Sequence, residues 1–172
     1  METEKTKVIT EEKAGVAVLV KFLALFGIIF AAPFFPNQVL TGPIVNAILF
    51  ISVVILGIKG AALLALTPSL VALAVGSLPL VLLPMVPFIM AGNLIMIYTF
   101  NYLRFRNYWS GVISAGILKY LFLYSTSFIV INLVIKKQLA SSISLMMSWP
   151  QLATAILGGI IAYFFLKSIK KI

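Results

Sequence analysis

The segment Pro79-Leu-Val-Leu-Leu-Pro84-Met-Val-Pro87-Phe-Ile-Met-Ala-Gly92-Asn93 combines an apolar run with three prolines and ends in an amide side chain. Proline interrupts a helix but is accepted in its first turn, so one helix is predicted to end near Pro79 and another to begin by Pro87. Asn93 then lies inside the second helix, among hydrocarbon side chains, where an unpaired amide costs free energy. The segment therefore predicts a helical hairpin that brings Asn93 to a neighbouring helix or to a cavity.

The composition places this hairpin in a membrane. Of the 172 residues, 62% are hydrophobic and only 10% are charged, and the mean hydropathy is +1.16. The apolar runs are continuous and do not alternate with polar residues, which favours membrane helices over a membrane β-barrel. At about 20 residues per span, the length allows roughly five to seven helices. The predicted fold class is all-α, a polytopic integral membrane protein with a bundle of transmembrane helices.

Six spans are expected after a short polar cytoplasmic segment, residues 1–13, in which Thr10 would cap the first helix. A tight turn is expected at Lys59-Gly60, and residues 14–172 form a single six-helix membrane domain. The third span is short and contains Pro68, so a re-entrant segment is the alternative there. The expected spans are Ala14–Ala32, Thr41–Ile58, Ala61–Ser77, Leu82–Leu103, Tyr108–Ile135 and Trp149–Leu166.

The net charge of +9 reflects membrane topology and not a nucleic-acid partner. With both termini in the cytoplasm, most Lys and Arg residues flank the inner ends of the spans, as the positive-inside rule requires. The sequence contains no Asp, His or Cys, and its four acidic residues all precede the first span: Glu2, Glu4, Glu11 and Glu12. These absences exclude disulfides, thiolate or imidazole metal sites and Ser-His-Asp or Cys-His catalysis. We therefore expect no enzymatic activity, no metal and no cofactor.

Polar side chains concentrate in the outer half of the fourth, fifth and sixth spans and in the first outer loop. This pattern predicts an outward-facing cavity for a small solute, with amides and hydroxyls to orient it and aromatic rings for apolar contact. The alternative is structural, because hydroxyls often bond the carbonyls of their own helix and amides often join helices. The candidate substrate-binding residues are Asn37, Gln38, Asn46, Asn93, Lys119, Tyr124, Ser125, Trp149 and Gln151.

Lys119 is the deepest charge in the expected spans. No acidic residue within the membrane can pair with it, so it needs carbonyls, water, a lipid phosphate, a partner subunit or an anionic ligand. Lys21 lies closer to the inner end of its span and can extend to the interface. A neutral or anionic solute therefore suits the chain better than a cation.

Several motifs resemble the substrate-binding (S) components of energy-coupling-factor transporters. The resemblance rests on the six short spans, on Pro87-Phe-Ile-Met-Ala-Gly-Asn93 and on Gly116-Ile-Leu-Lys-Tyr-Leu-Phe-Leu-Tyr124. Within that family, a subgroup labelled as hydrogenase-associated is similar at Pro36-Asn-Gln38, Thr41-Gly-Pro-Ile-Val-Asn-Ala47 and Met147-Ser-Trp-Pro-Gln151. The similarity covers nearly the whole chain from residue 14 onward.

The resemblance implies a subunit in the plasma membrane of a prokaryote that captures a micronutrient outside the cell. Its partners would be a transmembrane coupling subunit and two ATPase subunits, with membrane lipid around them. In that family the first three helices face the coupling subunit, often through Ala-x-x-x-Ala in the first helix. Here Ala14 is followed four residues later by Val18, and only Gly27 and Ala31 keep the small-residue spacing. Gly27 and Ala31 are therefore the candidate partner-interface residues.

Two other classes of function stay open at this point. One is a non-catalytic structural or assembly subunit of a larger membrane complex, such as a membrane-bound hydrogenase. The other is a membrane enzyme acting on lipid, which ranks last because the sequence offers no constellation of acid, base and nucleophile. No nucleotide-binding loop is present, so any dependence on ATP must come from partner subunits.

Overall fold

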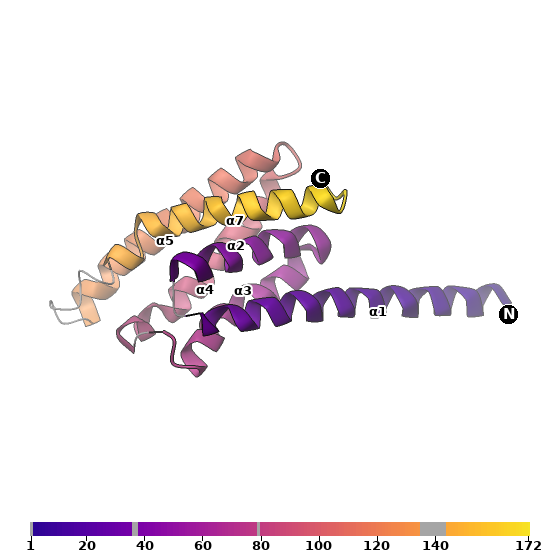
Figure 1. Cartoon of the computed structure of the whole chain (residues 1–172), viewed down its shortest axis with the longest axis horizontal. Helices are drawn as coiled ribbons and strands as arrows, with labels where there is room; N and C mark the ends of the chain where they lie inside the picture. The colour runs from indigo at the N-terminus through magenta and orange to yellow at the C-terminus, as the bar shows by residue number, and fades with distance from the viewer. Residues whose placement is uncertain (1, 36–37, 79, 135–143) are drawn as a thin grey trace.

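In the computed structural model, which describes residues 2–35, 38–78, 80–134 and 144–172, the chain is a bundle of helices with no strand among these residues (Figure 1). Of residues 2–14, 38–39, 80–81 and 133–134 only the helical backbone is described. The elements in chain order are α1 (Glu2–Ala31), the 3-10 turn η1 (Ala32–Phe34), α2 (Gln38–Ile55), α3 (Gly57–Ala74), the 3-10 segment η2 (Leu80–Met85), α4 (Val86–Leu103), α5 (Tyr108–Val134) and α7 (Trp149–Ser168).

Most of these helices are long and apolar enough to cross a membrane. Five segments meet both conditions, and the apolar part of α2, Leu40–Ile55, is shorter. The chain is therefore a multi-pass membrane protein, as its composition predicts. The count of six spans and the cytoplasmic side of the termini stay predictions. The five segments are Gly15–Phe34, Gly57–Ala74, Leu82–Leu103, Tyr108–Asn132 and Ser144–Ser168.

Helix α2 is the core of the bundle. Every residue from Val45 to Val53 is buried, which fits a helix that is apolar on all sides. Its most extensive contacts are with α7, while α4 packs mainly against α5. The edge of the Phe50 ring meets Phe100 of α4, with ring centroids 4.7 Å apart. The short helix α2 is therefore surrounded by other helices and has little contact with lipid. Its apolar side chains form the interior of the bundle.

A glycine determines how closely α2 and α7 approach. A Cβ built on Gly158 of α7 would lie 2.8 Å from the backbone nitrogen of Ala47 and 2.9 Å from the carbonyl oxygen of Pro43. Both atoms belong to the backbone of α2, so they cannot move aside as a flexible side chain would. The sequence spacing of Gly158 and Ala162 indicates close helix contact, and both residues are buried.

The proline-rich hairpin has the predicted break. Helix α3 ends at Ala74, η2 follows, and α4 begins at Val86 with Pro87 in its first turn. The expected turn at Lys59-Gly60 is wrong, because α3 already begins at Gly57. Gly57 has a φ of +75°, a left-handed conformation that favours glycine. The chain therefore turns at the first of two nearby glycines.

The starts of α1 and α5 differ from what the sequence analysis predicted. Thr10 does not cap the first helix, since α1 runs without interruption from Glu2 and residues 1–13 belong largely to it. The start of α5 has a cap that the sequence analysis did not identify. There the Asn107 Oδ1 accepts hydrogen bonds from the backbone N–H groups of Trp109 (2.8 Å) and Ser110 (3.1 Å), which satisfies donors that the first turn leaves open.

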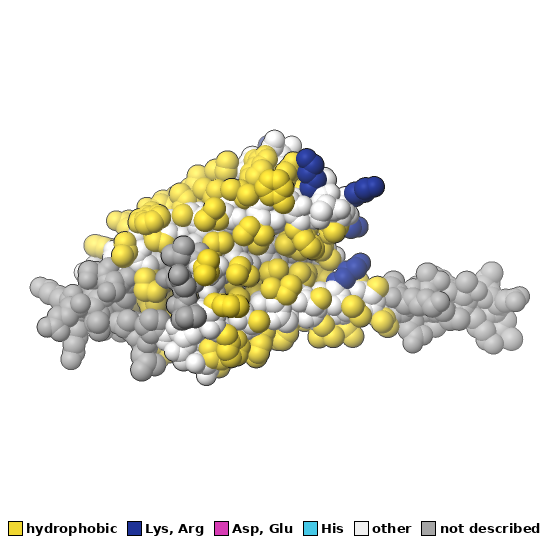
Figure 2. All heavy atoms as spheres, in the orientation of Figure 1, with side chains coloured by type: hydrophobic (Ala, Val, Ile, Leu, Met, Phe, Trp, Pro, Cys, Tyr) yellow, Lys and Arg dark blue, Asp and Glu magenta, His cyan; other side chains and the backbone are white. Residues whose placement is uncertain are grey.

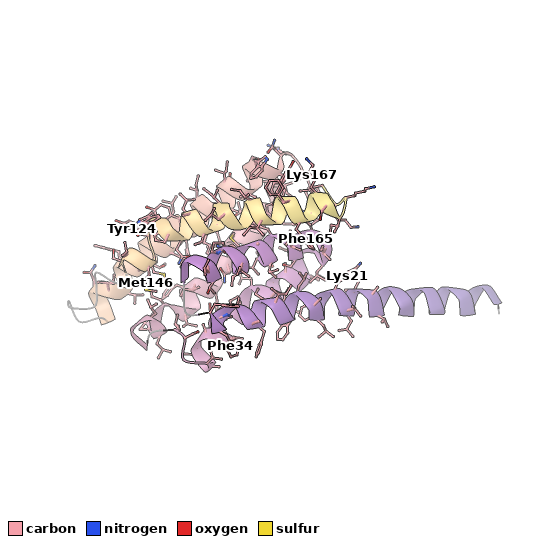
Figure 3. All side chains as sticks on the ribbon, viewed as in Figure 1. Lys21, Phe34, Tyr124, Met146, Phe165 and Lys167 are labelled. Atoms are coloured by element: carbon pink, nitrogen blue, oxygen red, sulfur yellow. The ribbon has the colours of Figure 1, made fainter. Side chains whose placement is uncertain are left out.

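Positive charge gathers at one end of the bundle. On the face shown in Figure 2, the visible Lys and Arg side chains lie at the end where Figure 1 marks the C-terminus, and apolar side chains cover much of the rest. Figure 3 places Lys21 and Lys167 at this end, and Phe34, Tyr124 and Met146 toward the other. Among the residues whose side chains the structure describes, positive charge therefore gathers at this end, while Lys136 and Lys137 lie outside the described residues.

Candidate functional site

A cavity of about 260 Å³ lies among the helices. Its walls come from η1 and the residue after it, the beginning of α2, the second half of α3, η2, the beginning of α4, the middle of α5 and the beginning of α7. Except for α5, which lines the cavity with its middle, each of these elements lines it with the part that lies away from the basic end of the bundle. Four candidates from the sequence line it together: Asn46, Asn93, Lys119 and Gln151.

Lys119 and Asn46 form the central polar contact. Lys119 is 3% exposed, and its Nζ donates a hydrogen bond of 2.7 Å to Asn46 Oδ1. Asn46 Nδ2 in turn donates to Thr154 Oγ1 at 3.3 Å, and Thr154 Oγ1 donates to the carbonyl oxygen of Gln151 at 3.2 Å. This relay joins α5 through α2 to α7. Because an ammonium only donates, it fixes which end of the Asn46 amide faces it.

Asn93 reaches the cavity from the opposite wall. Its Nδ2 donates to the carbonyl oxygen of Ala65 on α3 at 3.1 Å. That carbonyl follows the one on Leu64, which loses its helical donor because Pro68 has no N–H. Asn93 therefore joins α4 to the part of α3 where Pro68 omits a backbone hydrogen bond, as a structural amide would. It also lines the cavity, and its Oδ1 accepts no hydrogen bond from any residue that the structure describes.

Other polar groups on the wall keep unused hydrogen-bonding capacity. Gln151 Nε2 donates to the carbonyl oxygen of Met146 at 3.0 Å, while its Oε1 meets no donor among the described residues. Ser69 is 5% exposed, and its hydroxyl also has no hydrogen bond within the described part of the chain. Among the described residues no fully buried side-chain nitrogen or oxygen lacks a partner, so these unused atoms are at least partly accessible. These atoms are therefore available to a bound molecule.

Charge in the cavity comes from Lys119 alone among the lining residues. No Asp or Glu follows Glu12 in the sequence, so this part of the chain has no carboxylate to compensate the ammonium. An amide oxygen relieves part of the cost of burying a cation but supplies no opposite charge. Among the residues that the structure describes, no cluster of three acidic, imidazole or thiol groups could hold a metal ion.

Three candidates do not reach the cavity: Tyr124, Ser125 and Trp149. Tyr124 is 48% exposed and Trp149 is 65% exposed, and Ser125 is exposed as well. The reason is helix phase. On α5 the inward positions are Lys119, Leu123 and Ser127, and a step of five residues from Lys119 to Tyr124 rotates the side chain by roughly 140°. The same step separates Trp149 from the buried Thr154.

The remaining candidates stay predictions. Asn37 lies outside the described residues, and Gln38 is described only as the first residue of α2. Gly27 and Ala31 are exposed on α1, and a Cβ on Gly27 would meet no atom within 4 Å. That surface is open to a neighbour, but it contains no feature that identifies one.

The sequence analysis missed two features of the site. Ser69 had no distinguishing signal, because a serine in a membrane helix usually bonds a carbonyl of its own helix. The pairing of Lys119 with Asn46 was also missed, since 73 positions separate the two residues and no local pattern relates them. Rotating each helix so that its small residues face inward would have identified Thr154, which shares a face with Gly158.

The fold and the site together define a class: a multi-pass helical membrane protein with a partly open cavity between its helices, in which amides, hydroxyls and one lysine interrupt an apolar wall. No family model, curated protein or solved structure matches the chain. The particular function therefore has to be argued from the residues of the cavity.

Proposed function

We propose that this chain is the substrate-binding subunit of an energy-coupling-factor type importer. It captures a small organic solute, neutral or anionic, from outside the cell. It then delivers the solute inward together with a membrane coupling subunit and two ATPase subunits. The chain itself performs no catalysis, and its location is the plasma membrane of a prokaryote.

The observation that carries this proposal is the cavity with Lys119, Asn46, Asn93 and Gln151 on its wall. A volume of about 260 Å³ is slightly below the usual range for drug-sized ligands. It corresponds to roughly nine water molecules. If polar residues served only to join helices, they would leave no space between them. The combination of space and unused hydrogen-bonding atoms favours a solute.

The position of the cavity supports capture from outside. Its walls lie mostly toward the end of the bundle remote from Lys21 and Lys167, which Figure 3 labels at the basic end of the described structure. Since positively charged ends face the cytoplasm in most membrane proteins, the cavity then lies in the outer half of the membrane. An importer subunit needs this arrangement, whereas an assembly subunit has no need of an outward cavity.

Native mass spectrometry of the protein purified from its own membranes tests the proposal. We expect one small molecule per chain, and we expect the variants Asn93→Ala, Lys119→Ala and Gln151→Ala to retain less of it. The matched control is Asn132→Ala, because Asn132 is an exposed amide on α5 that bonds its own helix at the carbonyl of Phe128. If all three cavity variants keep the bound molecule at the level of the control, the cavity is not the binding site.

Affinity purification separates the importer from its rival. A tagged chain should bring down a membrane coupling subunit and two ATPase subunits. Stoichiometric recovery with a membrane-bound hydrogenase or another large complex, together with an empty cavity, would contradict the transport function and favour an assembly role.

A further inference from the structure

Among the described residues, Lys119 lacks hydrogen-bond acceptors for most of its N–H groups. The ammonium of Lys119 carries three N–H donors, and one of them is used by Asn46. The other two meet no acceptor among the residues that the structure describes, although Lys119 is only 3% exposed. A buried cation without a counter-ion is unfavourable unless a negative group joins it.

The hydrogen bonds of Asn46 fix the orientation of its amide, so Asn46 cannot offer Lys119 a further acceptor by turning. Asn46 gives its oxygen to Lys119 and its nitrogen to Thr154, and the Thr154 hydroxyl then donates to a backbone carbonyl. Turning the Asn46 amide around would place two donors against each other. The unused donors therefore stay on Lys119, which lines the cavity.

Helix dipoles do not change this balance. The helices α2, α4 and α7 begin at the cavity end of the bundle, whereas α1, α3 and the described part of α5 end there. Helix starts, which favour anions, and helix ends, which favour cations, therefore both occur at this end of the bundle. When it is protonated, Lys119 contributes one positive charge to the cavity. It matches one negative charge, whereas a phosphate monoester, with a charge of about −1.5 to −2, would bring an uncompensated excess.

The remaining side chains on the cavity wall indicate which kind of molecule would fit beside Lys119. Hydrocarbon and thioether side chains make up much of it, and the amide oxygens of Asn93 and Gln151 can accept hydrogen bonds from one or two N–H or O–H groups. The apolar lining residues include Phe35, Val45, Leu82, Ile89, Met146 and Met147.

Resting on the proposed function, we infer that the solute is a small carboxylic acid, bound as the monoanion, with a largely apolar body. Its carboxylate accepts hydrogen bonds from Lys119 and completes the charge that the protein leaves open. Its body lies against the methionines and the aliphatic side chains. Asn46 and Thr154 are positioning residues, which hold Lys119 for the carboxylate.

Three probes of one shape test the charge preference: 3-phenylpropionate, 3-phenylpropionamide and 3-phenylpropylamine. Each is titrated by calorimetry at pH 7 into the full-length protein in lipid nanodiscs, with empty nanodiscs as the blank. A charge-assisted hydrogen bond predicts that the carboxylate binds at least ~10-fold more tightly than the amide. The protonated amine should show no binding.

Two variants test whether Lys119 causes the preference for the carboxylate over the amide. Lys119→Met should bring the affinity for 3-phenylpropionate down to that for the amide, whereas Lys21→Met should change neither, because Lys21 is exposed on α1 and does not line the cavity. Asn46→Asp is the sharper variant. It adds a carboxylate beside Lys119 in nearly the same shape, so it should abolish the preference for the anion while the protein stays folded.

The outcomes separate the two proposals. Equal affinity for the carboxylate and the amide, or an unchanged preference in Asn46→Asp, overturns the carboxylic-acid inference and leaves the solute cavity standing. If none of the probes binds and native mass spectrometry finds no bound molecule, the proposed function fails together with the inference. If Lys119→Met does not fold, Asn46→Asp alone decides.

Discussion

Lys119 on α5 and Asn46 on α2, which lie 73 positions apart in the sequence, are joined by a hydrogen bond of 2.7 Å between Nζ and Oδ1. Both side chains are almost fully buried, at 3% and 1% exposed. The other lysines whose side chains the structure describes, such as Lys21, Lys59 and Lys167, are exposed on the helix surface. This one is held inside the bundle by a neutral amide, which orients the charge without neutralising it.

The first prediction concerns the next member of that relay. Thr154→Val keeps the shape of the side chain but removes the acceptor of Asn46 Nδ2, which lies 3.3 Å away. Leaving that donor unpaired should lower the free energy of unfolding by about 1–2 kcal/mol. It should also weaken binding of 3-phenylpropionate by roughly 3- to 10-fold. Calorimetry and equilibrium unfolding measure the two effects.

The control is Thr126→Val, because the Thr126 hydroxyl bonds the carbonyl of Phe122 in its own helix. It should change stability by no more than about 0.5 kcal/mol and leave probe binding intact. Equal effects at both threonines would mean that the relay does not position Lys119.

The second prediction concerns the contact between α2 and α7. In Gly158→Ala the new methyl group would meet backbone atoms of Ala47 and Pro43 at less than 3 Å. Overpacking of this kind costs about 1–3 kcal/mol. Because Asn46 belongs to the same contact, with its Cβ 2.7 Å from the added atom, probe affinity should fall as well. Gly27→Ala, on an open face of α1, should be neutral or slightly stabilising; a loss as large as at Gly158 would contradict the packing argument.

The third prediction concerns the turn between α2 and α3. Gly57 has a φ of +75°, a conformation that costs a residue with a Cβ about 1–2 kcal/mol. Gly57→Ala should therefore lower the midpoint of thermal unfolding, and Gly57→Asn should lower it less, because asparagine tolerates this region better. Gly15→Ala is the control, because Gly15 is helical and its Cβ would meet nothing within 4 Å. If alanine and asparagine at position 57 are both harmless, the turn has been assigned to the wrong residue.

The fourth prediction concerns the basic end of the bundle. The Tyr108 hydroxyl donates a hydrogen bond of 2.8 Å to the carbonyl oxygen of Gly159, which joins the start of α5 to α7. Tyr108→Phe removes that bond while the ring contacts with Phe100 and Tyr163 stay. We expect a loss of about 0.5–1.5 kcal/mol in unfolding free energy and unchanged probe affinity. Tyr102→Phe, at a side chain that is 76% exposed, should have no measurable effect; a drop in probe affinity in Tyr108→Phe would contradict the placement of the site.

The sequence predicted the class of fold because the physical signals were strong. Continuous apolar runs predict membrane helices, and the prolines from Pro79 to Pro87 predict the break that separates α3 from α4. Boundaries were less certain. Leu56-Gly57-Ile-Lys59-Gly60 offers two glycines, and the lysine drew the expected turn to the wrong one. The deciding property, the positive φ of Gly57, is a backbone conformation that the residue type permits but does not specify.

The site was predicted in part for a related reason. Asn93, Lys119 and Gln151 were identified because polar groups are costly in a membrane interior, and this argument holds at any helix orientation. Tyr124 and Trp149 were included on their chemistry alone, without asking which way each helix is turned. Helix phase depends on tertiary contacts such as Gly158 against α2, and these join segments that are distant in the sequence.

In the proposed complex the solute anion becomes part of the folded state, because it compensates the charge of Lys119. A ligand that binds only the native protein raises its unfolding free energy by about 2.7 kcal/mol at a concentration 100 times its dissociation constant. Here the ligand would also relieve a charge that the empty fold carries at a cost. Removing it during purification should therefore weaken the protein itself, and restoring a matching anion should recover its resistance to heat.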